Sequence, residues 1–209
     1  MKRILFQGDS ITSARRYPED RNFRGSGYAT MVSGKLGYEY PGEYEFINMG
    51  VGGDRITELM ARSKSDIIHL APDYLSILIG INDAWLDVAY QNGVSAERFE
   101  LLYNLLIQDI TVALPHIKII LLEPFVLQVP TNQEHWNAFY RETKKRAEAT
   151  KRVAERNGLV FIPLQQRFEE AAAKAPAEYW LFDGIHPTAA GHELVKRAWM
   201  EGFCLLEKT

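Results

Sequence analysis

The sequence contains a single cysteine, Cys204, and no long uninterrupted run of apolar residues. One cysteine excludes a disulfide bond within the chain and a cluster of thiolates on a metal. The thiol lies in the apolar stretch Phe203-Cys204-Leu205-Leu206, which predicts a packed and unreactive side chain. A membrane-spanning helix needs about 20 apolar residues, and no secretory leader is evident. We therefore expect a soluble, cytoplasmic protein.

An excess of basic residues is also missing. The formal net charge is −3, and acidic and basic side chains are interleaved along the chain. No positive field points to nucleic acid or to an anionic membrane as a partner, so neither is expected. The 209 residues, 46% of them hydrophobic, fit one domain that covers residues 1–209 and buries a sizeable core.

What the chain does contain is a regular alternation of short apolar runs and longer segments with helical periodicity. The apolar runs predict five strands, at residues 4–6, 44–49, 74–79, 117–122 and 159–162. Helices are expected at residues 27–36, 56–70, 96–113, 131–157 and 188–206. Strands that alternate with helices predict a parallel sheet with right-handed crossovers. We expect an α/β fold, a flavodoxin-like three-layer α/β/α sandwich whose five-stranded parallel sheet has the order 2-1-3-4-5.

Polar and glycine-rich segments follow the first three predicted strands. They are Gly8-Asp9-Ser10-Ile11, Asn48-Met49-Gly50-Val51-Gly52-Gly53 and Gly80-Ile81-Asn82-Asp83. The carboxyl ends of parallel strands meet at one edge of the sheet, where open α/β sheets bind ligands. Ser10 is therefore placed to present a hydroxyl at this edge, although a serine after a strand is more often a helix cap.

A serine hydroxyl needs a base to act as a nucleophile, and one of the five histidines is placed to supply it. His186 lies in a segment that runs Asp183-Gly184-Ile185-His186-Pro187. Asp183 can hold one imidazole nitrogen, across a tight turn at Gly184, so that the other nitrogen accepts the serine proton. Taken alone, the segment also fits a helix cap beside an incidental histidine. The other histidines read as surface or helix residues: His69, His116, His135 and His192.

Acyl transfer also needs donors for the oxyanion that forms on the attacked carbonyl. Gly53 can offer an unobstructed backbone N–H, Asn82 a side-chain amide, and Ser10 its own backbone N–H. A dinucleotide-phosphate loop is the alternative for the glycines, but Arg55 stands where its third glycine would be. Asn82 followed by Asp83 is, by itself, also a common turn pair.

A metal site is the remaining alternative for the polar segments. Asp9, Asp83, Asp183 and His186 are the residues that could surround a cation. Their spacing matches neither a His-Glu-x-x-His motif nor a dense carboxylate motif. Asp9 is instead expected to hydrogen-bond the backbone of the serine turn. No metal and no cofactor is therefore expected.

Two segments on the ligand-binding edge, residues 12–26 and 83–95, are predicted to be long loops of the kind that carry function. Arg55, Trp85 and Trp180 lie near the polar segments and are the candidate substrate-binding residues. Aromatic faces can stack on pyranose rings, and guanidinium groups can hydrogen-bond sugar hydroxyls. Ordinary loop packing remains the alternative for each of them.

Taken together, Gly8-Asp9-Ser10, Gly53, Asn82 and the pair of Asp183 and His186 resemble the ordered blocks of the SGNH hydrolases, also called the GDSL family. Position 11 is Ile where the name-giving motif has Leu, a conservative departure. The resemblance implies Ser10 as the nucleophile, His186 as the base and Asp183 as its orienting acid. It also implies Ser10, Gly53 and Asn82 as oxyanion donors, a flavodoxin-like fold and no metal.

This resemblance further implies hydrolysis of an ester through an acyl-enzyme on Ser10. Residues 50–59 and 77–85 look similar to bacterial acetylesterases that act on xylan-type oligosaccharides. We expect a short-chain acetylesterase whose substrate is a small-molecule or oligosaccharide ester and, because some relatives assemble, a homo-oligomer. Lipase, lysophospholipase and thioesterase activities remain open within the family. A non-catalytic flavodoxin-like ligand-binding module remains open outside it.

Overall fold

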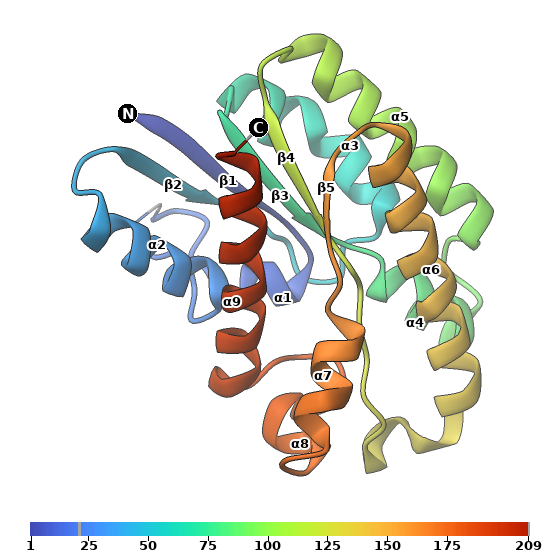
Figure 1. Ribbon diagram of the computed structural model, residues 1–209. Helices are drawn as coiled ribbons and strands as arrows, with labels where there is room; N and C mark the ends of the chain where they lie inside the picture. The colour runs from blue at the N-terminus through green and yellow to red at the C-terminus, as the bar shows by residue number, and fades with distance from the viewer. Residues whose placement is uncertain (21, 209) are drawn as a thin grey trace.

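A single parallel sheet organises the computed structural model, which describes residues 1–20 and 22–208. Its strands are β1 (Lys2–Gly8), β2 (Tyr44–Asn48), β3 (Tyr74–Leu78), β4 (Lys118–Leu122) and β5 (Val160–Ile162). Their order is β2-β1-β3-β4-β5, and every neighbouring pair is parallel. The predicted fold class and strand order are confirmed (Figure 1).

Helices cover both faces of this sheet (Figure 1). One face carries α2 (Tyr28–Glu39) and α9 (Ala189–Leu206), and the other carries α3 (Ile56–Asp66), α5 (Ala96–Ala113) and α6 (Trp136–Arg156). Alternate strand residues enter the two cores, so that Ile4 and Phe6 join one core while Leu5 joins the other. Strands buried on both faces read as continuous apolar runs, which is why the sequence revealed them.

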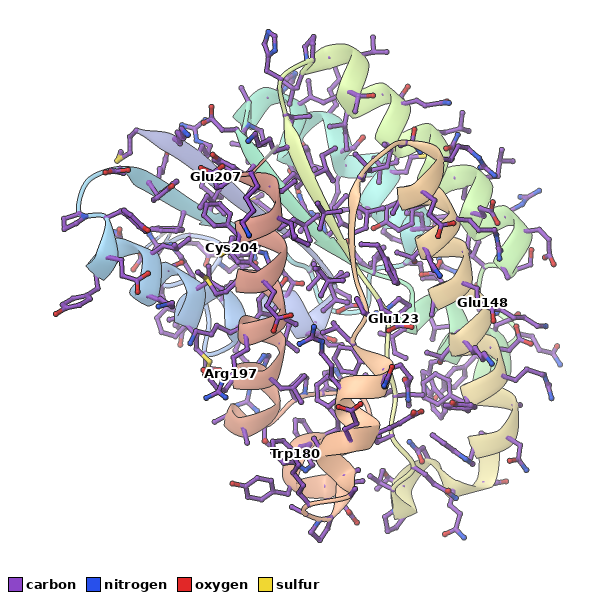
Figure 2. The ribbon with its side chains drawn as sticks, viewed as in Figure 1. Glu123, Glu148, Trp180, Arg197, Cys204 and Glu207 are labelled. Atoms are coloured by element: carbon purple, nitrogen blue, oxygen red, sulfur yellow. The ribbon has the colours of Figure 1, made fainter. Side chains whose placement is uncertain are left out.

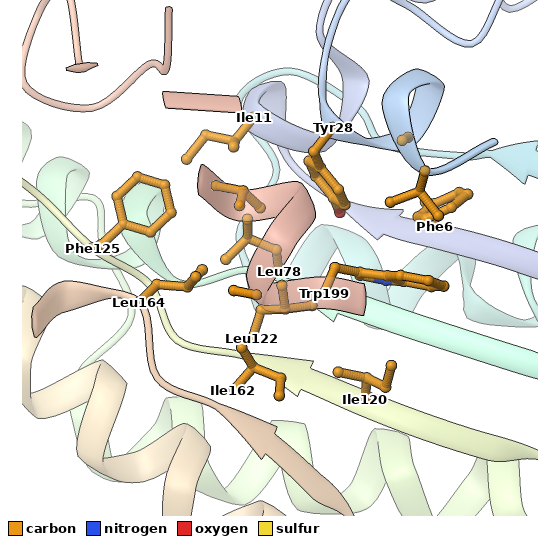
Figure 3. Packing of buried hydrophobic residues seen from close by; sticks show 14 of the residues in the cluster. Phe6, Ile11, Tyr28, Leu78, Ile120, Leu122, Phe125, Ile162, Leu164 and Trp199 are labelled. Atoms are coloured by element: carbon orange, nitrogen blue, oxygen red, sulfur yellow. The ribbon is translucent and has the colours of Figure 1, made fainter. Parts of the chain in front are cut away.

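The core beneath α9 is built around Trp199, which is 1% exposed. Its ring stacks on Phe203 with centroids 5.3 Å apart, and Phe6 of β1 contacts both Trp199 and Tyr28 of α2. Figure 3 shows Trp199 lying between Phe6 and the side chains of the neighbouring strands. Because buried aromatic side chains contribute large apolar areas, this packing holds α9 against β1.

On the other face, a fully buried charge ties α6 to α4 (Ile81–Tyr90). The Arg146 guanidinium donates to Asp87 Oδ2 at 3.0 Å, to the Val94 carbonyl at 2.5 Å, and to Glu142. A buried charge is tolerated only when it is paired and hydrogen-bonded, as Arg146 is here. This network anchors the helix whose first turn carries Asn82.

The prediction of a long loop at residues 83–95 was wrong. Helix α4 takes up most of this segment, and only residues 91–95 connect it to α5. Its side chains at Ile81, Asp83 and Ala84 are buried, so the helix is held by packing rather than by a capping signal in the sequence. In the other predicted loop, residues 12–26, α1 (Ser10–Ser13) occupies the start and residue 21 lies outside the described residues.

The expectation of a packed Cys204 was also wrong, because the side chain is exposed on α9 (Figure 2). The inward face of this helix is taken by Trp199, Phe203 and Leu206, which are buried. Position 204 is rotated by about 100° from position 203, which turns the thiol toward the outside of the helix. An apolar neighbourhood in sequence therefore did not mean burial.

Shorter helices account for the remaining differences from the predicted elements. The predicted helix at 56–70 ends as α3 and continues as a separate turn, η1 (Ile68–Leu70), and the predicted helix at 131–157 begins as η2 (Pro130–His135) before α6. Two short helices were not predicted, α7 (Gln165–Ala172) and α8 (Ala177–Trp180). Within residues 1–20 and 22–208, no helix is long and apolar enough to cross a membrane.

Candidate active site

Ser10, His186 and Asp183 form one continuous hydrogen-bonded chain, although Ser10 lies far from the other two in sequence. The Ser10 Oγ lies 2.8 Å from His186 Nε2, and His186 Nδ1 lies 2.6 Å from Asp183 Oδ2. A nucleophile, a base and an orienting carboxylate in this arrangement have the geometry of acyl-transfer enzymes. The structure thus brings together the three residues that the sequence singled out for catalysis.

A tight turn at Gly184 folds the Asp183 carboxylate back onto His186. Asp183 Oδ1 accepts the main-chain N–H groups of Ile185 at 2.9 Å and His186 at 2.7 Å, which leaves Oδ2 for the imidazole. Gly184 has a φ of +87°, and a Cβ there would lie 2.2 Å from Asn132 Nδ2. Only glycine fits this turn, so the backbone itself sets the distance between the carboxylate and the ring.

The Asp183 carboxylate changes the acid–base behaviour of the pair. Its hydrogen bond raises the pKa of His186 above the usual 6.5, against the opposing effect of partial burial. Burial alone would raise the pKa of Asp183, but hydrogen bonds from His186 and Ile185 outweigh it and lower that pKa. Both shifts stabilise an imidazolium beside an ionised carboxylate, the state that a general base reaches after it takes a proton.

The Ser10 turn depends on Gly8 and Asp9. Gly8 has a φ of +151°, and a Cβ there would lie 2.2 Å from the Leu78 carbonyl oxygen. Asp9 caps α1, because its Oδ1 accepts the Ile11 N–H at 2.9 Å, as the sequence predicted. The chain can therefore leave β1 sharply and present Ser10 at the edge of the sheet.

Asp9 is also a buried carboxyl directly beneath this turn. It is 1% exposed, and no described residue hydrogen-bonds its second oxygen, Oδ2. Burial raises the pKa of Asp9 to about 7, and the nearby Asp54 adds to the rise, while the Ile11 N–H and His186 oppose it. Within the described part of the chain, no group of three or more His, Cys, Asp or Glu side chains could hold a metal ion.

Gly53 and Asn82 lie on neighbouring segments that are tied together. The Asn82 amide donates one N–H to the Asp54 carbonyl at 3.0 Å, which leaves its second N–H available. Among the residues described, none accepts a hydrogen bond from the backbone N–H of Gly53 or Ser10. Three donors without protein acceptors are what a site for a developing oxyanion requires.

Two charged residues fix these segments: Arg62, which the sequence did not single out, and Asp83, which was considered only as a metal ligand or turn residue. Arg62 of α3 pairs with Asp54 at 2.6 Å and donates to the carbonyls of Gly8 at 3.3 Å and Met49 at 2.8 Å, which lie at the ends of β1 and β2. Asp83, which is fully buried, accepts the N–H of Ile56 with both oxygens, at 3.1 and 3.2 Å. An arginine on a helix after a glycine-rich segment carries no sequence signal for such a role.

A cavity of about 720 Å³ opens beside Ser10. Its walls include Arg15, Phe182, His186 and His192, together with the small side chains of α1 and the start of α9. Phe182 is 58% exposed and stacks on His186 with ring centroids 5.7 Å apart. Arg15 has a φ of +61°, an uncommon backbone conformation that holds an exposed guanidinium at the cavity. Phe182 and His192 were not expected from the sequence.

The three candidate substrate-binding residues do not line this cavity. Arg55 pairs with Glu58 at 2.7 Å and donates to the carbonyl of Asn92. The Trp85 ring of α4 lies with its centroid 5.0 Å from that of Phe139 of α6. Trp180 of α8 lines a separate cavity between α7 and α9 (Figure 2). Each therefore occupies a packing position in this structure, and a role in substrate binding stays a prediction.

Residues 6–194, which contain all of these segments, match the GDSL-like lipase/acylhydrolase family. The chain belongs to this family. It is 31% identical over 209 residues to an acetylxylan esterase from Geobacillus stearothermophilus, an alignment that covers 95% of this chain and 92% of the relative. This GDSL-family protein is a carboxylic ester hydrolase, as the four motifs predicted.

Solved structures of family members share the whole fold. A putative GDSL-like lipase from Parabacteroides merdae superposes with a TM-score of 0.92 at 31% identity, covering 98% of this chain and 96% of that one. Axe2, an acetylxylan esterase from Geobacillus stearothermophilus, superposes with a TM-score of 0.86 at 29% identity, covering 96% and 93%. Three catalytic mutants of Axe2 replace a serine, an aspartate and a histidine, and the last two lie three positions apart.

Proposed function

We propose that the protein removes acetyl groups from oligosaccharides through an acetyl-enzyme on Ser10. The observation that carries the proposal is the chain of hydrogen bonds from Asp183 through His186 to Ser10, at 2.6 and 2.8 Å. As the Ser10 Oγ attacks the ester carbonyl, its proton passes to His186 Nε2, and Asp183 stabilises the imidazolium that forms. The imidazolium then protonates the departing alcohol oxygen. A water activated by the same nitrogen releases acetate and restores Ser10.

The negative oxygen of the tetrahedral intermediate would be held by the donors around Ser10. These are the backbone N–H groups of Ser10 and Gly53 and the free N–H of the Asn82 amide. Such donors act most strongly when they are fixed before the reaction, and the hydrogen bond from Asn82 to Asp54 fixes this amide. The catalytic mutants of Axe2 support the roles proposed for Asp183 and His186, because their aspartate and histidine have the same spacing.

The acetyl-sugar specificity is supported by the character of the cavity and by the relatives. Its lining includes hydroxyl side chains, an arginine and two histidines, a donor-rich surface suited to hydroxylated ligands. Long acyl chains need an extended apolar surface, and among the described residues that line the cavity Phe182 is the only large aromatic side chain. The name of the matched Geobacillus esterase assigns acetylxylan as its substrate. An acetylated xylo-oligosaccharide is therefore the substrate proposed here.

The test measures hydrolysis of p-nitrophenyl acetate, p-nitrophenyl palmitate and acetylated xylo-oligosaccharide by the parent protein and by Ser10→Ala. We expect acetate release from the first and third substrates, little hydrolysis of the palmitate, and loss of at least about 10⁴ in kcat for Ser10→Ala. Hydrolysis of the palmitate faster than of the two acetyl substrates would mean that the protein is a lipase and not an esterase of acetylated sugars. Unchanged activity in Ser10→Ala would remove the proposed nucleophile.

A further inference from the structure

His192, six residues after His186 in the first turn of α9, lies on the wall of the cavity beside Ser10. Its Nδ1 accepts the backbone N–H of Tyr28 at 3.2 Å, and the side chain is only 7% exposed. The backbone at Gly27 lies against the ring, because a Cβ there would be 2.8 Å from His192 Cε1. The ring is therefore fixed in place by α2 before any ligand binds.

The hydrogen bond from Tyr28 also decides where the proton of His192 lies. A backbone N–H can only donate, so Nδ1 must keep its lone pair and the neutral ring carries its proton on Nε2. Burial lowers the pKa of His192 to about 4, and the nearby His186 lowers it further in the same direction. At neutral pH the residue is a neutral donor with a single N–H.

No described residue accepts a hydrogen bond from this Nε2–H. The atom is also not sealed within the protein, since it is absent from the buried polar atoms that lack a partner, while the residue lines the cavity. A fixed donor without a protein acceptor at the edge of a reaction site is suited to a polar atom of a ligand.

The geometry of the reaction indicates which part of the ester meets this donor. His186 must protonate the departing alcohol oxygen, and His186 and His192 line the same cavity. Of the three donors that would hold the carbonyl oxygen, Ser10 lies at the edge of this cavity, whereas Gly53 and Asn82 do not line it. The acetyl methyl has no acceptor atom. The alcohol part of the ester is therefore the part that reaches His192.

We propose that His192 Nε2–H donates a hydrogen bond to a hydroxyl or ring oxygen of the sugar that leaves, and so selects polyhydroxylated alcohols over plain ones. The inference rests on the proposed deacetylation of oligosaccharides. His192 is then a specificity residue that acts on the alcohol part of the substrate, while the acyl group is handled elsewhere. The ligand atom is a hydrogen-bond-accepting oxygen on a hydroxylated ring.

Two substitutions separate this role from the structural contact with Tyr28. In His192→Asn, the amide oxygen can replace Nδ1 as the acceptor for the Tyr28 N–H, but nothing replaces Nε2. In His192→Gln, the longer side chain can place an amide N–H near Nε2 but leaves the Tyr28 N–H without its acceptor. The readout is the ratio of kcat/KM for acetylated xylobiose to kcat/KM for p-nitrophenyl acetate, together with the Tm. His116→Asn, at an exposed position before β4, is the matched control.

We expect the ratio to fall about tenfold in His192→Asn, to fall less in His192→Gln, and to stay unchanged in His116→Asn. The Tm should show the opposite order, with the larger decrease in His192→Gln. A ratio in His192→Asn equal to that of the parent would overturn the inference. The inference would also be overturned if the ratio were equal in the two variants and their losses of activity followed their decreases in Tm, because that pattern indicates only a structural role.

A binding measurement supports the kinetics if a variant folds poorly. In Ser10→Ala labelled with ¹⁵N-histidine, saturating xylobiose should shift the Nε2 resonance of His192 and leave its Nδ1 resonance in place; no shift of Nε2 contradicts the inference.

The failure of the proposed function and the failure of this inference can be distinguished. A parent that hydrolyses p-nitrophenyl acetate but no sugar acetate removes the proposed function and this inference with it. A parent that hydrolyses both, with an unchanged ratio in His192→Asn, removes this inference alone.

Discussion

His186 and His192 lie six residues apart and line the same cavity, yet their environments have opposite effects. The pKa of His186 is raised, because Asp183 lies 2.6 Å from its Nδ1. The pKa of His192 is lowered to about 4, because the ring is buried and lies near His186. Its Nδ1 accepts the Tyr28 N–H, whereas Nδ1 of His186 faces a carboxylate. Asp183 therefore favours a proton on His186, whereas burial disfavours a proton on His192.

The same difference separates the chemistry of the two residues. A proton acceptor during catalysis must be able to become an imidazolium, and Asp183 makes this possible for His186. A residue that recognises a neutral sugar is better kept neutral, because a second cation beside the imidazolium of His186 would oppose the proton transfer.

The largest effect is expected from Asp183→Asn, which gives His186 a neutral partner like that of His192. The amide N–H of asparagine can donate to Nδ1, which moves the imidazole proton to Nε2, where it blocks uptake of the Ser10 proton. We expect kcat for p-nitrophenyl acetate to fall about 10³–10⁴-fold. Because the carboxylate that raises the pKa of His186 is gone, the acidic limb of the kcat/KM profile should also move to lower pH.

Asp109→Asn is the control, since Asp109 is an exposed residue of α5 and the substitution removes the same charge from the surface. It should leave both kcat and the pH profile as in the parent. Retention of more than a tenth of kcat in Asp183→Asn, with a normal Tm, would show that His186 does not depend on Asp183.

A smaller loss is expected from Asn82→Ala, which removes a donor on the acyl side of Ser10 rather than the alcohol side. The oxyanion forms only as the reaction proceeds, so the loss should fall on kcat, by about 10²–10³-fold, with little change in KM. Asn137→Ala, at an exposed position of α6, is the control. The ratio of sugar to p-nitrophenyl acetate hydrolysis should stay close to the parent value, because both substrates share the acetyl group. An unchanged kcat would remove Asn82 from the oxyanion site.

The two histidines also show which residues of the site can be predicted from the sequence. His186 was found because Asp183, Gly184 and Pro187 surround it within a few residues, so that its partner and its turn are local. His192 was read as an ordinary helix residue, because its partner Tyr28 is 164 positions away and donates through the backbone, which any residue could do. Local pairs are visible in a sequence, whereas contacts between a side chain and a distant backbone are not.

The same reason explains the errors and the successes elsewhere. The strands and the two-sided core follow from apolar runs, which are a local pattern, whereas the strand order was taken from the common order of such folds; all were predicted correctly. The helix α4 was missed because distant Arg146 and burial hold it, and not a cap of its own. Arg55, Trp85 and Trp180 were chosen by residue type and by nearness in sequence to the polar segments, and none of the three lines the Ser10 cavity. Arg55 pairs with Glu58, Trp85 contacts Phe139, and Trp180 lines a separate cavity.

A further predicted effect concerns the stability that His192 gives as pH changes. The unfolded histidine binds a proton below its usual pKa of 6.5, whereas the folded one stays neutral down to about 4. Between these values the unfolded chain binds more protons, so the free energy of unfolding falls as pH falls. This difference between the folded and unfolded pKa values lowers the free energy of unfolding by about 3 kcal/mol from pH 7 to pH 4.

Other groups act in the opposite direction, so the effect must be measured as a difference between variants. Burial raises the pKa values of Asp9 and Asp83 to about 7, so these carboxyls bind protons more readily in the folded chain and add stability as pH falls. The pairing of His186 contributes fully below its unfolded pKa of 6.5 and is lost as pH rises through the higher folded value.

Urea unfolding of the parent and His192→Asn at pH 7, 5.5 and 4 isolates the term due to His192, because the contributions of Asp9, Asp83 and His186 are common to both. The asparagine keeps an acceptor for Tyr28 but cannot take up a proton, so the variant should lose about 3 kcal/mol less than the parent between pH 7 and pH 4. If the free energy of unfolding changed equally with pH in the two proteins, His192 would be protonated in the folded protein. Its Nδ1 could then not accept the Tyr28 N–H, and the contrast between the two histidines would disappear.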